Sequence, residues 1–396
     1  MSEVATSTPS NTEADHTGAN RRSRAVRVAV TLAVVALLLV LPLYVDEFWL
    51  RTGFAVCAAV IGAIGLNLLV GTTGLLSLGH AFFLAVGAIT YVYVAGEEGG
   101  TATKISGLGW PPLVAMLLGV LMAGLCGLLF SPIAARLRGI YLGVASLGLV
   151  FIGQHVLNTW TSVTGGFNGR VTPEFAIFGF HFASDNPEFM VLDVPYGPAE
   201  RLWYLGLVLA GATIWFARNL LRSRPGRALQ TLRDSEVAAA VMGVNVQGYK
   251  ARVFLVSSML GGLSGVLYAL SIGAVAPESF SLLLSVQFLA MIVLGGLGSV
   301  WGAAVGAAFV SALPLVFQEY ADSLPYIAEP GSPGIVASQA AAFLYGLAIV
   351  LVVLFEPEGL AGLTRRVGQM FRRSSAGPDT PARQSVNSQP QEESNP

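Results

Sequence analysis

The sequence RNLLRSRPGRALQTLRDSEVAAAVMGVNVQGYKAR, residues 218–252, carries nine charged side chains in a chain that is otherwise apolar. Of all 396 residues, 54% are hydrophobic and only 11% are charged, whereas soluble domains are about 25% charged. Long apolar runs flank the stretch at residues 202–217 and 253–272. These features predict an all-α, polytopic integral membrane protein in which residues 218–252 form a central cytoplasmic loop.

The loop itself has a predictable local structure. The pair Pro-Gly at 225–226 is a helix breaker, a helix-forming run follows at 227–242, and Gly243 is a helix stop. Asp234 and Ser235 are favourable N-cap residues. The run is therefore predicted as two short helices that meet at this point.

One face of the predicted loop helices is small and weakly apolar, which suits docking against a partner protein better than burial in lipid. At helical spacing this face holds Ala228, Leu232 and Ala239, widened by Ser235 and Met242. We expect Glu236 to be exposed to water until the partner docks. The alternative is an ordinary basic cytoplasmic loop without a partner.

Apolar runs along the chain predict about ten transmembrane helices, at residues 25–45, 52–70, 75–94, 113–134, 139–157, 202–217, 253–272, 281–293, 300–317 and 339–355. With both termini in the cytoplasm, 18 of the 22 Lys and Arg residues lie inside, as the positive-inside rule requires. The predicted domains are a disordered tail (1–24), a membrane domain (25–358) and a second disordered tail (359–396). The long outer loop, 158–201, is expected to be partly folded.

Several functional classes are disfavoured by composition. A net charge of −1 gives no nucleic-acid footprint, and the cysteines and histidines have no metal-ligand spacing. Neither lysine is followed by Ser or Thr, so a phosphate-binding loop is absent and ATP is not hydrolysed by that route. No catalytic residue, metal or cofactor is predicted. The apolar runs lack Asp and Glu, which argues against ion-coupled carriers and favours energy supplied by a partner.

Glycines interrupt corresponding apolar runs in the two halves of the chain, and such paired breaks indicate a transport path. The predicted helix breaks are Gly71, Gly74, Gly79, Gly295, Gly296 and Gly298. Four polar residues near them are candidates for lining the path: Asn67, Ser77, His80 and Gln287. The alternatives are that glycine is simply common at helix contacts and that these polar groups are interhelical hydrogen-bonding residues.

Four segments resemble one known family: residues 65–83 (GLNLLVGTTGLLSLGHAFF), 136–142, 226–245 and 293–302 (VLGGLGSVWG). The chain resembles the M-type permease subunits of branched-chain amino-acid ABC importers over residues 30–358. The resemblance implies a second homologous permease subunit, two ATP-binding cassette subunits, an extracytoplasmic solute-binding protein and a location in the bacterial inner membrane. It also identifies the loop as a coupling element that docks an ATPase, with Arg227, Arg233, Asp234, Glu236, Ala238, Ala239 and Gly243 as its residues.

The substrate remains open at this point. The resemblance implies branched-chain, hydrophobic amino acids, but related permeases carry urea or short amides. A hypothesis of a different class is a stand-alone secondary carrier or channel, which would transport without ATP.

Overall fold

The computed structural model describes residues 33–97, 106–137, 139–177, 180–182, 190–191, 194–195, 197–320 and 336–355. The two predicted tails lie outside these residues, as does most of the loop before the last apolar run. Part of the predicted outer loop, residues 183–189, is also outside them.

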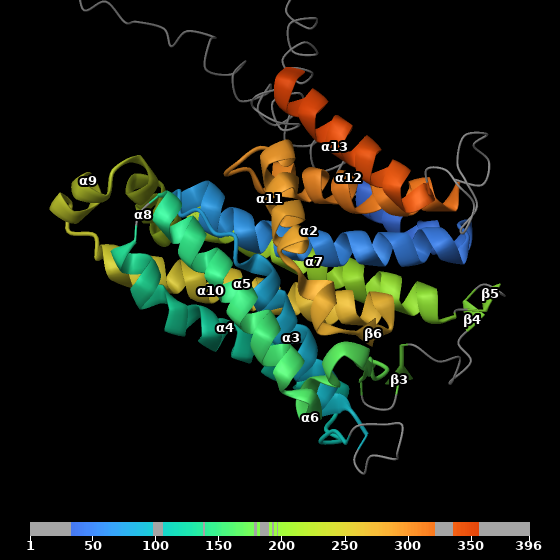
Figure 1. Ribbon diagram of the computed structural model, residues 1–396. Helices are drawn as coiled ribbons and strands as arrows, with labels where there is room; N and C mark the ends of the chain where they lie inside the picture. Colours follow the sequence, from blue (N-terminus) through green and yellow to red (C-terminus); the bar gives the residue numbers. More distant parts are fainter. Residues whose placement is uncertain are drawn as a thin grey trace, which may run out of the picture.

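The chain folds into a bundle of apolar helices with short elements at its ends (Figure 1). In order, the elements are a helix at Ala33–Leu43 that ends in η1 (Leu41–Leu43), α2 (Glu47–Thr73), α3 (His80–Ala95), α4 (Pro112–Arg136), α5 (Ile140–Thr159), α6 (Thr161–Thr164), η2 (Gly166–Asn168), β1 (Arg170–Val171), β2 (Ala176–Ile177), β3 (Phe180–His181), β4 (Met190–Val191), β5 (Val194–Pro195), α7 (Pro198–Arg222), α8 (Arg224–Asp234), α9 (Glu236–Val241), α10 (Val246–Ile272), β6 (Ala274–Val275), η3 (Pro277–Phe280), α11 (Leu282–Gly295), α12 (Val300–Glu319) and α13 (Ala337–Phe355).

Six helices in the described part of the chain are long and apolar enough to cross a membrane: α2, α4, α5, α7, α10 and α12. The 27 residues of α2 extend about 40 Å, which exceeds a hydrocarbon core of about 30 Å. Helices α3 and α11 and the segment Ala33–Leu43 are apolar but shorter. The all-α, polytopic fold is confirmed, and the number of ten spanning helices stays a prediction.

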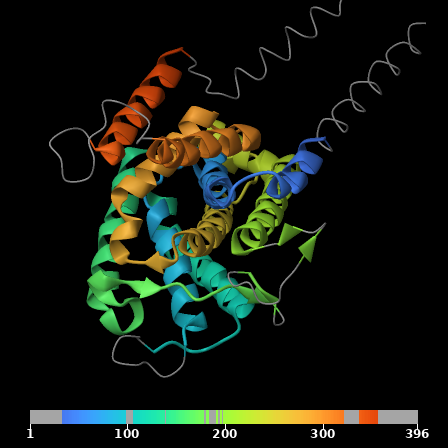
Figure 2. The same ribbon diagram turned by 90° about the vertical axis from the view of Figure 1, so that its right-hand side faces the viewer.

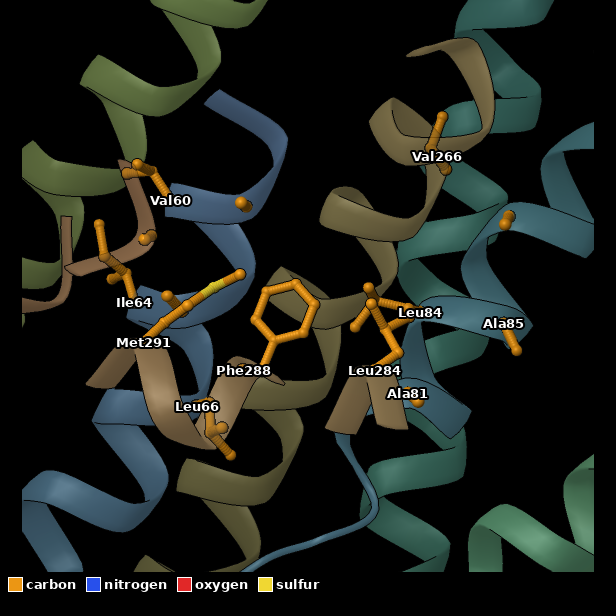
Figure 3. Close-up of a cluster of buried hydrophobic side chains, with 14 of the residues drawn as sticks. Val60, Ile64, Leu66, Ala81, Leu84, Ala85, Val266, Leu284, Phe288 and Met291 are labelled. Atoms are coloured by element: carbon orange, nitrogen blue, oxygen red, sulfur yellow. The ribbon is translucent and has the colours of Figure 1, made fainter. Parts of the chain in front are cut away.

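Helices α2 and α10 form the centre of the bundle, and α13 lies at its edge beside α12 (Figures 1 and 2). Figure 3 shows the core between α2, α3, α10 and α11, where Phe288 and Met291 lie beside Ile64. Small residues let these helices approach closely. A side chain on Gly87 of α3 would overlap the backbone of Gly262 of α10, so this crossing requires glycine.

Two links interrupt the bundle, and they correct part of the predicted set of helix breaks. Gly71 lies inside α2, which continues to Thr73 and ends at Gly74 in the left-handed conformation (φ 70°). A non-helical segment, residues 74–79, then leads to α3, so the helix predicted to begin at residue 75 begins at His80. In the second half, Gly295 ends α11, while Gly296 and Gly298 adopt positive φ in the link to α12.

The central loop forms two helices that meet at Ser235, as predicted. The side chain of Ser235 caps α9 by accepting a hydrogen bond from the Ala238 N–H (3.2 Å). The predicted helix break lies two residues earlier than expected, at Ser223 between α7 and α8, and Pro225 and Gly226 belong to the first turn of α8. Proline is tolerated there since the N–H that it lacks has no intrahelical partner in the first turn.

The described part of residues 158–201, the segment predicted as an outer loop, is partly folded, as expected. Its strand β1 pairs with β6, which follows α10, and short hairpins form from β2 with β3 and from β4 with β5. The Arg170 guanidinium donates to the carbonyl oxygens of Val163 (2.8 Å) and Ser106 (3.0 Å). Partial burial lowers the pKa of Arg170, which nevertheless stays protonated at physiological pH.

Candidate functional site

Helices α8 and α9 lie together at one end of the bundle, while β3, β4 and β5 lie at the other (Figure 1). Leu229 of α8 anchors the pair in a cluster of buried apolar residues. The cluster joins the end of α2 and its link, the end of α4, the start of α5 and the start of α10, through Leu69, Leu75, Phe130, Ala134, Leu142, Val253 and Phe254. The predicted coupling element is therefore packed against four other parts of the membrane domain.

The outward face of this element differs from the predicted one. Leu232 and Ala239 are buried within the chain, with exposed fractions of 2% and 0%. Met242 of the predicted face is exposed (75%), and the other large exposed apolar side chains of α9 are Val237 and Val241, at 68% and 83%. Leu232 and Ala239 are placed wrongly on the predicted face because it assumes one continuous helical period over residues 228–242. The backbone is extended at Ser235, and the two helices change direction there.

Glu236 is not the water-exposed group that the sequence predicted. Its Oε1 lies 2.7 Å from Nζ of Lys250 on α10, and the side chain is only 25% exposed. Lys250 is fully buried, and a buried charged group of this kind requires an oppositely charged partner, which Glu236 supplies. Sequence reasoning counted Lys250 among the loop charges but gave it no role, because an apolar run follows at 253 and nothing local marks its partner.

Arg233 reaches a different helix. Its Nη1 donates a hydrogen bond of 2.6 Å to the carbonyl oxygen of Gly71, in the last turn of α2. The neighbouring Asn67 is bound to the link between α11 and α12. Its Oδ1 accepts from the Gly298 N–H (2.9 Å), and its Nδ2 donates to the carbonyl of Ser299 (3.1 Å).

The other predicted coupling residues lie on the surface of the same element. Arg227, Asp234 and Ala238 are exposed, and Arg227 donates weakly to the Arg222 carbonyl (3.4 Å). Gly243 follows α9 with φ 80°, a left-handed conformation that agrees with the predicted helix stop.

The structure does not bring the four predicted path residues to a common cavity. Asn67, Ser77 and His80 are each 1% exposed, and only Gln287 is partly exposed. His80 packs edge-on against Phe288, with ring centroids 5.2 Å apart, and its Cε1 would lie 3.1 Å from a Cβ on Gly261. A surface hollow on α5, lined by His155, Val156, Thr159 and Trp160, contains none of them. In this conformation three of the four are packing and hydrogen-bonding residues.

Serine hydroxyls hold the non-helical segment 74–79 and the first turn of α3 among the helices. Oγ of Ser146 on α5 accepts from the Leu78 N–H (2.8 Å), and Oγ of Ser285 on α11 accepts from the Ala81 N–H (3.0 Å). Non-helical backbone at membrane depth requires such partners, because lipid offers none. Ser285 was missed from the sequence, since a lone serine in an apolar run is an unspecific signal.

Comparison with known proteins connects this architecture to a family. Residues 48–353 match the family described as the branched-chain amino acid transport system / permease component. The chain belongs to this family. The match confirms the resemblance that the four sequence segments indicated.

Three relatives illustrate the range of this similarity. The high-affinity branched-chain amino acid permease LivM of Escherichia coli (strain K12) is 29% identical over 316 residues, which cover 77% of this chain and 68% of LivM. BraD of Pseudomonas aeruginosa, also a branched-chain amino acid permease, is 23% identical over 76% of this chain and 90% of BraD. The ribose import permease RbsC of Escherichia coli (strain K12) is 24% identical over 62% of this chain and 70% of RbsC. No solved structure matches the chain.

Members of the family are permease components of ABC transport systems. This member is therefore a multi-pass inner-membrane protein that associates with ATP-binding and substrate-binding components. The family is a transport component and not an enzyme class. The residues that the structure describes contain no cluster of His, Cys, Asp or Glu suited to a metal ion.

Proposed function

We propose that this chain translocates branched-chain amino acids across the cytoplasmic membrane as one of two homologous permease subunits. Two ATP-binding subunits drive it, and an extracytoplasmic binding protein delivers the substrate. Support for the substrate comes from the family and from relatives named for branched-chain amino acid transport.

The observation that carries the proposal is the outward face of α9, made by Val237, Val241 and Met242. The face is apolar and highly exposed, and it lies on a short helix that is fixed to α10 by the pair of Glu236 with Lys250. An apolar patch in a charge-rich segment marks a protein contact. An ATPase docked on this face would move α8 and α9 together with the ends of the membrane helices on which they pack.

The proposed orientation has α8, α9 and both termini in the cytoplasm. The ends of α4 and α7, at Arg136 and Arg222, are basic and belong to the same end of the bundle as α8. Basic residues favour the cytoplasmic side of a membrane. This arrangement places the pairing of β1 with β6 on the outer side, where a binding protein would deliver substrate.

The test is uptake by the reconstituted complex of this chain with its ATPases, second permease and binding protein. We expect ATP-dependent uptake of leucine, isoleucine and valine, but not of urea or ribose. Urea uptake without leucine uptake would move the substrate to the amide class, and uptake by this chain alone without ATP would establish a stand-alone carrier.

A variant pair tests the docking face separately. Val241→Glu places a charge in the apolar contact and should weaken the affinity of the permease for the ATPases about a hundredfold, which corresponds to about 2.8 kcal/mol. The ATPases should then no longer be recovered with the purified permease. Gln230→Glu introduces the same charge at an exposed position of α8 and is the matched control. Equal recovery with both variants would show that this face is not the docking surface.

A further inference from the structure

We propose that Arg233 is a positioning residue that transmits movement of the α8–α9 pair to the junction between α2 and the α11–α12 link. The proposal rests on the proposed function, because it needs an ATPase that moves this pair. In this role Arg233 acts through its contacts within the chain.

The first support is the contact that Arg233 makes with α2. The Arg233 guanidinium donates to the carbonyl oxygen of Gly71 at 2.6 Å, and 162 residues separate the two in sequence. The carbonyl groups in the last turn of a helix carry partial negative charge, so a cation there is stabilised. A hydrogen bond with a charged donor is also about twice as strong as a neutral one.

Gly71 is available to Arg233 because neighbouring carbonyls are already occupied. The Thr72 and Thr73 hydroxyls and the Gly74 N–H bind the carbonyl oxygens of Leu68, Leu69 and Val70, respectively. The end of α2 is thus hydrogen-bonded internally up to Val70, and Gly71 receives its bond from a residue of α8.

The last turn of α2, which holds Gly71, is in direct contact with the link between α11 and α12. A side chain on Gly71 would overlap the backbone of Gly298 and Oδ1 of Asn67, so α2 and the link meet backbone to backbone. A Cβ on Gly298 would lie 3.3 Å from Nη1 of Arg233, which places the guanidinium beside the link as well. The Asn67 side chain also binds two consecutive residues of the link, Gly298 and Ser299.

These contacts form one continuous chain from α8, through Arg233, to the end of α2 and the start of α12. The link is the point at which α11 ends and α12 begins, and Gly298 holds it with φ 81°. Glu236 binds α10 instead, so the two polar anchors of the helix pair lead to different helices. A displacement of α8 that stretches the Arg233 bond would therefore shift α2 and the link together.

The test measures the solute moved per ATP hydrolysed in proteoliposomes that contain the full complex. Arg233→Ala should lower this ratio about tenfold, because the loss of one charged hydrogen bond corresponds to about that factor. The ATPase subunits should still be purified with the permease, and ATP hydrolysis should persist. Arg233→Lys keeps a cation that can still reach one carbonyl, and it should restore part of the ratio. Arg224→Ala removes an exposed charge from the same helix and should match the unmodified protein.

An unchanged ratio in Arg233→Ala would overturn the proposal. It would also be overturned if Arg233→Ala and Arg233→Lys lowered uptake, ATPase activity and the melting temperature together, since that pattern describes a structural brace. The proposal that the ATPases dock on Val237, Val241 and Met242 can be refuted separately. If Val241→Glu retains the ATPases while Arg233→Ala lowers the ratio, the ATPase contact is misplaced but the role of Arg233 stands.

Discussion

Replacing Glu236 by glutamine would leave the buried ammonium of Lys250 without its counter-charge. The two groups lie 2.7 Å apart, with side chains 25% and 0% exposed. Removal of one partner from a buried ion pair costs about 3–5 kcal/mol, and the partial exposure of Glu236 places this case near the lower limit, at about 3 kcal/mol. Denaturant unfolding of the purified permease in detergent measures this loss.

A second substitution supplies the control. Lys250→Met fills the same volume without a charge and leaves Glu236 able to reach water, so we expect it to cost about 1 kcal/mol. The double variant has no stranded charge and should be more stable than Glu236→Gln alone by about 2 kcal/mol. A cost below about 0.5 kcal/mol for Glu236→Gln is typical of surface sites and would refute the assignment of a buried pair.

Two further outcomes are expected. Gly243→Val should lower the stability of the turn after α9 by about 2 kcal/mol and reduce ATP-dependent uptake, because φ is 80° at this position. Asparagine tolerates this conformation, so Gly243→Asn should retain most of the uptake. Equal uptake by the two variants would contradict the argument. A cysteine at the exposed position Ser235 should react with an impermeant reagent only from the cytoplasmic side. A cysteine at the exposed position Asn168 should react only from the outer side. The opposite pattern would reverse the proposed orientation.

Local chemistry made much of the α8–α9 pair predictable. Ser235 is a strong N-cap, and Gly243 is a residue suited to positive φ, so both helix ends could be placed from the sequence. The break after Gly295 was predictable for the same reason, since several glycines interrupt an apolar run. Family motifs added the transport role, which composition alone could not supply.

Contacts between distant residues could not be predicted in this way. The sequence predicts a helix break at Gly71, yet α2 continues to Thr73, and the Thr72 and Thr73 hydroxyls donate to the carbonyl oxygens of Leu68 and Leu69. The partners of Glu236 and Arg233 lie on α10 and α2, and no local pattern indicates them. A helical period also fails wherever two helices change direction, as it did across Ser235.

The shortness of α11 has a consequence for membrane insertion. Its 14 residues extend only about 21 Å, so α11 is too short to cross a hydrocarbon core of about 30 Å by itself, and we expect it to enter the bilayer as a hairpin with α12. The tip of that hairpin carries the backbone groups of Gly298 and Ser299, whose partner is Asn67 on α2. We therefore expect the C-terminal hairpin to reach its final position only after the N-terminal helices, which carry Asn67, have been inserted.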